Sequence, residues 1–184
     1  MAPQRGQNTE AKTEVPPACA AARDGDEDTL RRLFANEWQP LDTASRDAHG
    51  YRAHHWAAGS AKGCLALCLE LCDARTVDEL TLHERREGKR GGRSLLHWAC
   101  RNGVASHAAL LVACTLVDAR AADRTTPLML ALYGGHVDVC NILHKAGATV
   151  CLLVNDFDCG DAHWAAMGLD AVSTLAWLKR YATL

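Results

Sequence analysis

The sequence predicts an all-α solenoid of about five stacked helix-turn-helix units, and three observations predict it. The tripeptide His-Trp-Ala occurs three times in the 184 residues, at 55–57, 97–99 and 163–165. Segments that open with two small or apolar residues begin at positions 21, 57, 99, 131 and 165, which are 36, 42, 32 and 34 residues apart. Aromatic residues make up only 5% of the chain, whereas Ala and Leu are abundant, which favours closely packed helices over a broad sheet.

The repeat period also sets the domain organisation. A pair of short helices cannot bury its apolar face alone, so neighbouring pairs must stack. Residues 1–17 are polar, lack periodicity and end in two prolines, so we expect a disordered tail outside the fold. Residues 18–184 are expected to form one repeat domain. Its approximate units are 18–46, 47–82, 89–120, 121–154 and 155–184, with an inserted basic loop at 83–93.

The fourth unit contains the most regular segment, TTPLMLALYGGHVDVCNILHKAGA, at residues 125–148. Thr126 can cap the first helix through its hydroxyl group, and Pro127 then occupies the first helical position, where a missing N–H costs nothing. Gly147 suits a left-handed stop after the second helix. This segment closely resembles the ankyrin repeat. The matching residues are Thr126, Pro127, Leu128, Ala131, Gly135, His136, Val139, Ile142, Leu143, Gly147 and Ala148.

The resemblance extends in weaker form over residues 18–184. The second and third units keep Gly, His and Ala but lack the Thr-Pro start, although Ser94 can still cap a helix. The fifth unit matches less well at its start, and the first resembles a capping repeat with a polar outer face. The resemblance implies an ankyrin-repeat solenoid with short hairpin fingers projecting between the units. It also implies a concave face that binds another protein.

The repeated tripeptide is interpreted as a structural element of the units rather than as fragments of an active site. The resemblance implies that its histidines hydrogen-bond backbone at the base of the loops, and that its tryptophans fill an apolar slot facing the stack. On separate units the histidines would lie about 10 Å or more apart, too far to act on one substrate atom. The predicted structural repeat residues are His55, Trp56, His97, Trp98, Thr126, Pro127, His163 and Trp164.

The nine cysteines leave two interpretations open. Cys64, Cys68 and Cys72 recur every fourth residue and would share one face of a helix. They can form a packing face of small apolar side chains, or they can belong to a Cys/His-based metal-binding or redox protein. The sequence has no Cys-x-x-Cys pair, which favours packing, and we therefore assign no metal ligand.

Composition and motifs exclude several classes of function. The net charge of -2 and the isoelectric point of about 6.5 do not predict nucleic-acid binding. The longest apolar run, residues 108–117, is too short to span a bilayer, and no secretory signal is visible, so we expect a cytoplasmic or nuclear protein without membrane contact. No catalytic or phosphate-binding motif is present. We therefore predict no enzymatic activity, no small-molecule substrate and no cofactor.

The expected function is a protein-protein interaction module that acts as an adaptor, scaffold or regulatory or inhibitory subunit. The resemblance places partner contacts on the finger tips and on the residue pair that follows each Ala pair. Within this set, Tyr and Arg are the expected energetic anchors. The candidate partner-binding residues are His49, Tyr51, Arg90, Arg93, Arg101, Asn102, Arg124, Tyr133 and Phe157.

Two further segments carry hypotheses about partners. The basic loop 83–93 is either a solvated loop or an enlarged finger that captures an acidic peptide. The last predicted helix holds many apolar side chains although no further repeat follows it, which predicts self-association or docking of another domain. These side chains belong to Val172, Leu175, Trp177, Leu178 and Tyr181.

Overall fold

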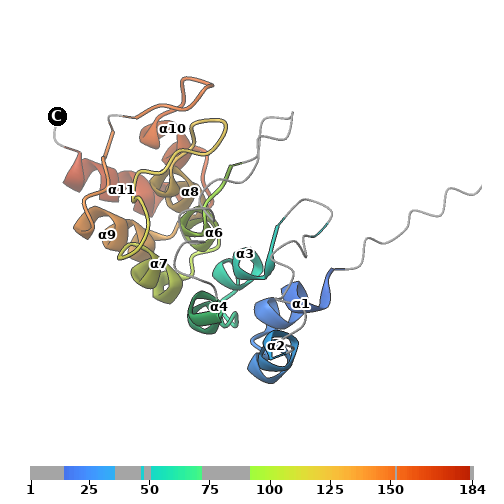
Figure 1. Cartoon of the computed structure of the whole chain (residues 1–184). Helices are drawn as coiled ribbons and strands as arrows, with labels where there is room; N and C mark the ends of the chain where they lie inside the picture. Colours follow the sequence, from blue (N-terminus) through green and yellow to red (C-terminus); the bar gives the residue numbers. More distant parts are fainter. Residues whose placement is uncertain (1–14, 36–46, 48–50, 72–91, 152, 183–184) are drawn as a thin grey trace, which may run out of the picture.

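The computed structural model describes residues 15–35, 47, 51–71, 92–151 and 153–182, and within these residues its helices form five consecutive pairs (Figure 1). The first helices of the pairs are α1 (Pro17–Asp24), α3 (Ala53–Ala58), α6 (Leu95–Arg101), α8 (Pro127–Gly134) and α10 (Asp161–Ala166). The second helices are α2 (Glu27–Phe34), α4 (Leu65–Leu71), α7 (Ala105–Leu111), α9 (Val137–Lys145) and α11 (Ala171–Tyr181). The predicted all-α solenoid is confirmed. Helix α1 begins at Pro17, the last residue of the expected tail.

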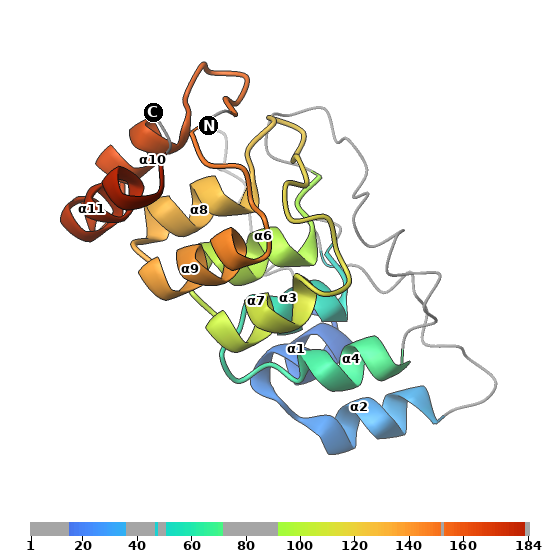
Figure 2. The same cartoon turned by 90° about the vertical axis from the view of Figure 1, so that its left-hand side faces the viewer.

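The pairs stand in chain order along the array, with α1 and α2 at one end and α10 and α11 at the other (Figure 2). Each first helix contacts the first helices of the neighbouring pairs, so these helices form one continuous layer. The second helices cover this layer, and the core lies between the two.

Buried alanines allow the first helices to lie close together. Ala57, Ala99 and Ala165, the last residues of the three His-Trp-Ala copies, are completely buried at 0% exposure. Ala22 and Ala131 are buried to the same extent in α1 and α8. A larger side chain at such a position would overpack the contact and typically costs about 1–3 kcal/mol. The small side chain of alanine therefore allows each unit to come close to the next.

Polar caps and glycines define the ends of the helices. The hydroxyl oxygen of Thr126 accepts a hydrogen bond from the Met129 N–H at 3.3 Å, with Pro127 at the first position of α8. The Ser94 hydroxyl oxygen accepts from the His97 N–H at 3.4 Å and caps α6. Gly147 has a φ of 90°, the left-handed conformation that was predicted for it after α9.

His97 joins the third unit to the fourth. Its ring is completely buried, and Nδ1 accepts a hydrogen bond from the Ser94 N–H at 3.1 Å. Because that nitrogen accepts, Nε2 carries the proton and donates to the Thr125 carbonyl oxygen, 3.0 Å away in the next unit. His55 is also buried, and its Nδ1 accepts from the Arg52 N–H at 3.3 Å. His163, in the fifth pair, is exposed.

The buried ring of His97 predicts a pH dependence of stability. Burial lowers its pKa from the ordinary 6.5 to about 4, so the folded protein holds the ring neutral while the unfolded chain protonates it as the pH falls. The stability that depends on the neutral ring is complete above pH 6.5 and is lost, by up to about 3 kcal/mol, as the pH falls toward 4. Wild type should therefore lose its advantage over His97→Gln across this range in urea unfolding.

Comparing the two proteins cancels the contribution of other titrating groups. One of these is Asp161, whose pKa burial raises to about 6 and which acts in the opposite direction. His163→Gln is the matched control, because it makes the same substitution at an exposed ring. A difference between wild type and His97→Gln that stays constant from pH 7.5 to about 4.5 would contradict this account.

Candidate functional site

A cavity of about 570 Å³ opens on the layer of first helices, where α1, α3 and α6 lie side by side. We call it the aromatic pocket. Its walls come from these three helices, from the turn after α3 and from the residues that precede α3. The residues that line it are Arg23, Asp47, Tyr51, His55, Trp56, Gly59, Ser60, Ala61, Trp98 and Asn102.

The repeat places two tryptophans in the same wall. Trp56 and Trp98 are each the fourth residue of their helices, α3 and α6, and stacking of these helices brings the two indole rings to the same side. Trp164 has the same place in α10, whereas α8 has the buried Leu130 there. The sequence predicts that the tryptophans face only the stack. Instead both rings are half-buried and line the pocket.

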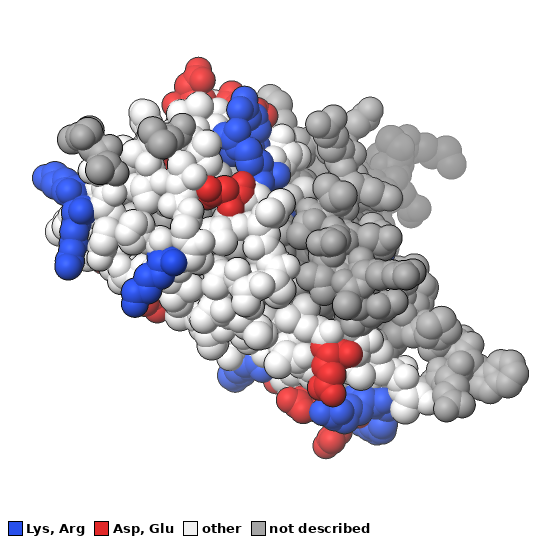
Figure 3. Space-filling model, turned by 60° about the vertical axis from the view of Figure 1, so that its left-hand side comes forward, with Lys and Arg blue, Asp and Glu red and all other residues white. Residues whose placement is uncertain are grey.

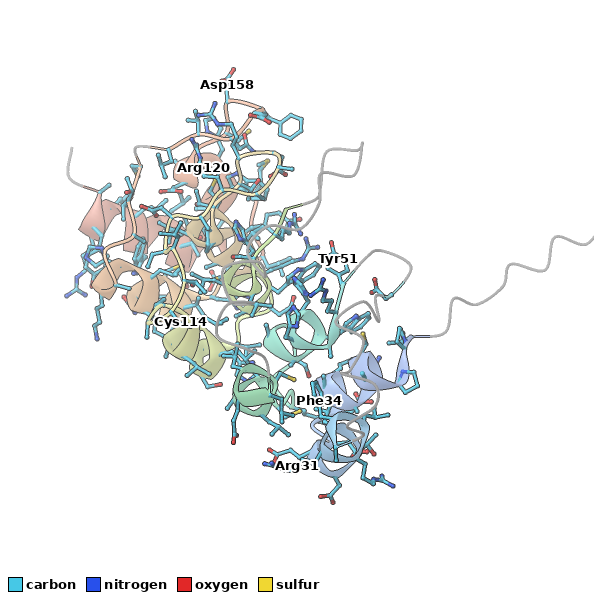
Figure 4. The ribbon with its side chains drawn as sticks, in the orientation of Figure 1. Arg31, Phe34, Tyr51, Cys114, Arg120 and Asp158 are labelled. Carbon is cyan, nitrogen blue, oxygen red and sulfur yellow. The ribbon has the colours of Figure 1, made fainter. Side chains whose placement is uncertain are left out.

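Tyr51 and Asp47 hold these rings from the segment before α3. The Tyr51 ring meets Trp98 edge to face, with centroids 5.1 Å apart and an interplanar angle of 82°. The Asp47 carboxylate accepts hydrogen bonds from the Trp56 Nε1–H at 3.1 Å and from the Tyr51 N–H at 2.8 Å. Figure 4 shows Tyr51 at the start of α3, on the side nearer α6. These contacts therefore hold the pocket wall in place in the unbound protein.

Arginines surround the rings. The Arg23 guanidinium lies 5.7 Å from the centroid of Trp56, and that of Arg93 lies 5.8 Å from the centroid of Trp98. Burial raises the pKa of Tyr51, and the positive charges of Arg93 and Arg101 oppose this increase. Both arginines therefore act on the pocket electrostatically.

Hydrogen bonds connect the end of α6 to the units on both sides. Asn102 Nδ2 donates to the Gly59 carbonyl oxygen at 2.6 Å, which connects the third unit to the second. His136 Nε2 lies 3.2 Å from the Arg101 carbonyl oxygen and connects the fourth unit to the third. The sequence predicts Asn102 as a partner contact. In the structure its amide donates a hydrogen bond that holds two neighbouring units together.

The structure brings some candidate residues together and separates others. Tyr51, Arg93, Arg101 and Asn102 belong to the pocket or its surroundings. Arg93 is 8% exposed and its guanidinium lies over the Trp98 ring, so its role as a partner contact stays a prediction. His49, Arg90 and most of the loop 83–93 lie outside the described residues.

The remaining candidates lie further along the array. The Tyr133 ring is 39% exposed and meets Trp164 edge to face at 5.7 Å. Phe157, 59% exposed, lies in the hairpin between α9 and α10. Asp156 of the same hairpin forms an exposed ion pair at 3.9 Å with Arg124, which precedes α8. Figure 4 shows that Arg120 and Asp158, on the two hairpins near this end, lie away from Tyr51. These residues form a second region, separate from the pocket.

The described cysteines lie mostly in the core. Cys64 and Cys68 are 9% and 1% exposed, and the Cys64 thiol faces the Ala22 carbonyl oxygen at 3.7 Å. Cys72, the third member of the predicted stripe, lies outside the described residues. Within the part of the chain that is described, no cluster of three or more His, Cys, Asp or Glu side chains could hold a metal ion. The geometry of Cys64 and Cys68 is that of packing residues.

No described helix is long and apolar enough to cross a membrane. On the face in Figure 3, basic and acidic side chains alternate between wide uncharged areas. The described residues of that face therefore form no continuous basic stripe of the kind that follows a nucleic-acid backbone.

Sequence reasoning missed Asp47 as a residue of the site, whereas Arg23 follows the first Ala pair and so belongs to the positions where the resemblance places partner contacts. It also assigned Trp56 and Trp98 to packing alone. One signal was available, because aromatic residues at the same helix position in adjacent units must lie side by side once the units stack. Asp47 precedes α3 and is not part of any repeated pattern in the sequence.

Comparison with known families supports the repeat interpretation. A family model described as ankyrin repeats (3 copies) matches residues 65–154, which run from α4 to the hairpin that follows α9. No curated protein matches the chain.

The burial of the cysteines predicts unequal thiol reactivity. Burial raises the pKa of Cys100 and Cys140, which are both completely buried, whereas Cys114 and Cys151 are exposed. In the native protein, an alkylating reagent should label Cys114 and Cys151 at least about tenfold faster than the other two, as measured by peptide mass spectrometry. Equal rates at all four positions would contradict the packing interpretation, and labelling in denaturant gives the control in which the rates converge.

Proposed function

Because residues 65–154 belong to the ankyrin repeat family, we propose that this chain is a protein-protein interaction module that binds its partner on the layer of first helices. Ankyrin repeats are generally modules of this kind. In this proposal the module acts as an adaptor, scaffold or regulatory or inhibitory subunit and has no enzymatic activity of its own. The proposed location is the cytoplasm or the nucleus, where the thiols of the described cysteines would stay reduced.

The observation that carries the proposal is the aromatic pocket. Half-buried Trp and Tyr rings that line an open cavity offer large contact area at a small cost in conformational entropy, and such side chains dominate binding energy at interfaces. Hydrogen bonds from Asn102 to Gly59 and from Trp56 to Asp47 hold the surface in place before binding. A preformed surface reduces the ordering cost of association.

Affinity capture with site variants tests the proposal. Arg101→Glu combined with Tyr133→Ala changes two exposed side chains of the first-helix layer, and Lys145→Glu changes an exposed side chain at the end of α9. With cross-linking mass spectrometry, proteins captured by wild type should disappear with the double variant and remain with Lys145→Glu. If both variants capture the same proteins as wild type, the first-helix layer is not the binding face.

A second copy of the chain is a further candidate partner at the α10–α11 end. The sequence predicts five apolar side chains in the last helix that no further unit covers. In the structure two of them, Trp177 and Leu178, are buried because α11 packs on α9. Leu169 and Val172 stay 82% and 83% exposed and support the proposal of self-association. Sedimentation velocity at rising concentration should show dimers for wild type and monomers for Val172→Glu. A monomer in both would count against this pairing.

A further inference from the structure

We propose that the aromatic pocket receives one uncharged apolar side chain, aromatic or branched aliphatic, from a partner segment that carries carboxylates beside that side chain. This inference rests on the proposed function and specifies the chemistry of the partner. The pocket between α1, α3 and α6 is its anchor point. The flanking carboxylates contact arginines at the rim.

The size and lining of the pocket fit an apolar anchor. Its volume of about 570 Å³ falls within the range of roughly 300–1,000 Å³ of cavities that bury small ligands. Trp56, Trp98 and Tyr51 contribute aromatic rings to a lining that is mostly apolar. The indole N–H of Trp56 is already bonded to Asp47 and does not need an acceptor from a ligand. Burying an apolar side chain there gains the free energy of desolvation of both surfaces.

The charges disfavour a cation in the pocket. An aromatic cavity beside a carboxylate can bind an ammonium group over the ring faces. Here guanidinium groups of the protein already lie 5.7 Å from Trp56 and 5.8 Å from Trp98, so a further cation would meet Arg23 and Arg93 at close range. The Asp47 carboxylate already accepts two hydrogen bonds, from Trp56 and Tyr51. A lysine side chain, methylated or not, is therefore a poorer occupant than a neutral one.

The same charges favour carboxylates at the rim. Arg101 is exposed at the end of α6 and forms no ion pair within the described part of the chain. Arg23 is 41% exposed and pairs with Asp24 in open solvent at 2.8 Å, where such a pair is weak and can exchange partners. Arg101 and Arg23 thus offer exposed guanidinium groups beside the pocket, whereas the Asp47 carboxylate is engaged by Trp56 and Tyr51. These exposed positive charges are complementary to an acidic segment.

Selection from a displayed library of random peptides tests the inference. The full wild-type chain is the bait, and Ala61→Trp is the counter-bait, because Ala61 lies exposed in the turn that lines the pocket and an indole there would fill the cavity from outside the core. Ala109→Trp is the matched control, at an exposed alanine of α7 away from the pocket. Circular dichroism and thermal unfolding verify that each bait is folded.

Peptides that wild type and Ala109→Trp enrich should combine an aromatic or branched aliphatic residue with adjacent Asp or Glu. In fluorescence anisotropy, a labelled peptide of this kind should bind Ala61→Trp at least about tenfold more weakly than wild type. Arg101→Glu should also weaken binding and reduce its dependence on salt.

Three results would overturn the inference. They are enrichment of peptides rich in Lys or Arg, undiminished binding to Ala61→Trp, or a selection that yields no peptide specific for the wild-type pocket. If peptides bind Ala61→Trp as tightly as wild type but lose binding to the variant with Arg101→Glu and Tyr133→Ala, the pocket is not the anchor point. The proposed function would then still stand, because the first-helix layer would remain the binding face. If neither the peptides nor the captured proteins respond to any of these variants, both proposals fail.

Discussion

The close contact between consecutive first helices is the constraint on which the rest of this structure depends. Helices of six to eight residues are too short to be stable alone, and each pair has one apolar side that only a neighbouring pair can cover. The chain meets this requirement with an alanine of zero exposure in each first helix. Hydrogen bonds across the unit boundaries, such as that from His97 to Thr125, then fix the register of one pair against the next.

The stacking also builds the candidate site. Because each unit repeats the same local geometry, equivalent positions of α3 and α6 point to the same side, and Trp56 and Trp98 become neighbours although 42 residues separate them in sequence. The residues that give the pocket its charge, Arg23 and Asp47, are not part of the repeated tripeptide. The fold therefore supplies the aromatic wall, and unit-specific side chains around it determine what the wall can bind.

Much of the fold follows from the sequence, because its signals are local or periodic. Thr126 and Ser94 cap helices where their positions predict, and Gly147 takes the left-handed conformation. Contacts between different units are much harder to predict. No periodic signal indicates that Arg93 folds against Trp98, or that Trp177 is buried and donates its N–H to Asn141 at 2.8 Å. Such contacts depend on the rotation of one unit relative to the next. The spacing of residues in a single sequence does not indicate this rotation.

The stability of Ala99→Leu tests the role of close helix contact most directly. Ala99 is completely buried in α6, and Ala109, exposed in α7, provides the matched position for the same substitution. In urea unfolding, Ala99→Leu should lower the free energy of unfolding by about 1–3 kcal/mol. Ala109→Leu should change it by less than about 0.5 kcal/mol. Equal effects of the two substitutions would mean that the first helices are not in limiting contact, and the account of the stack and its pocket would then be wrong.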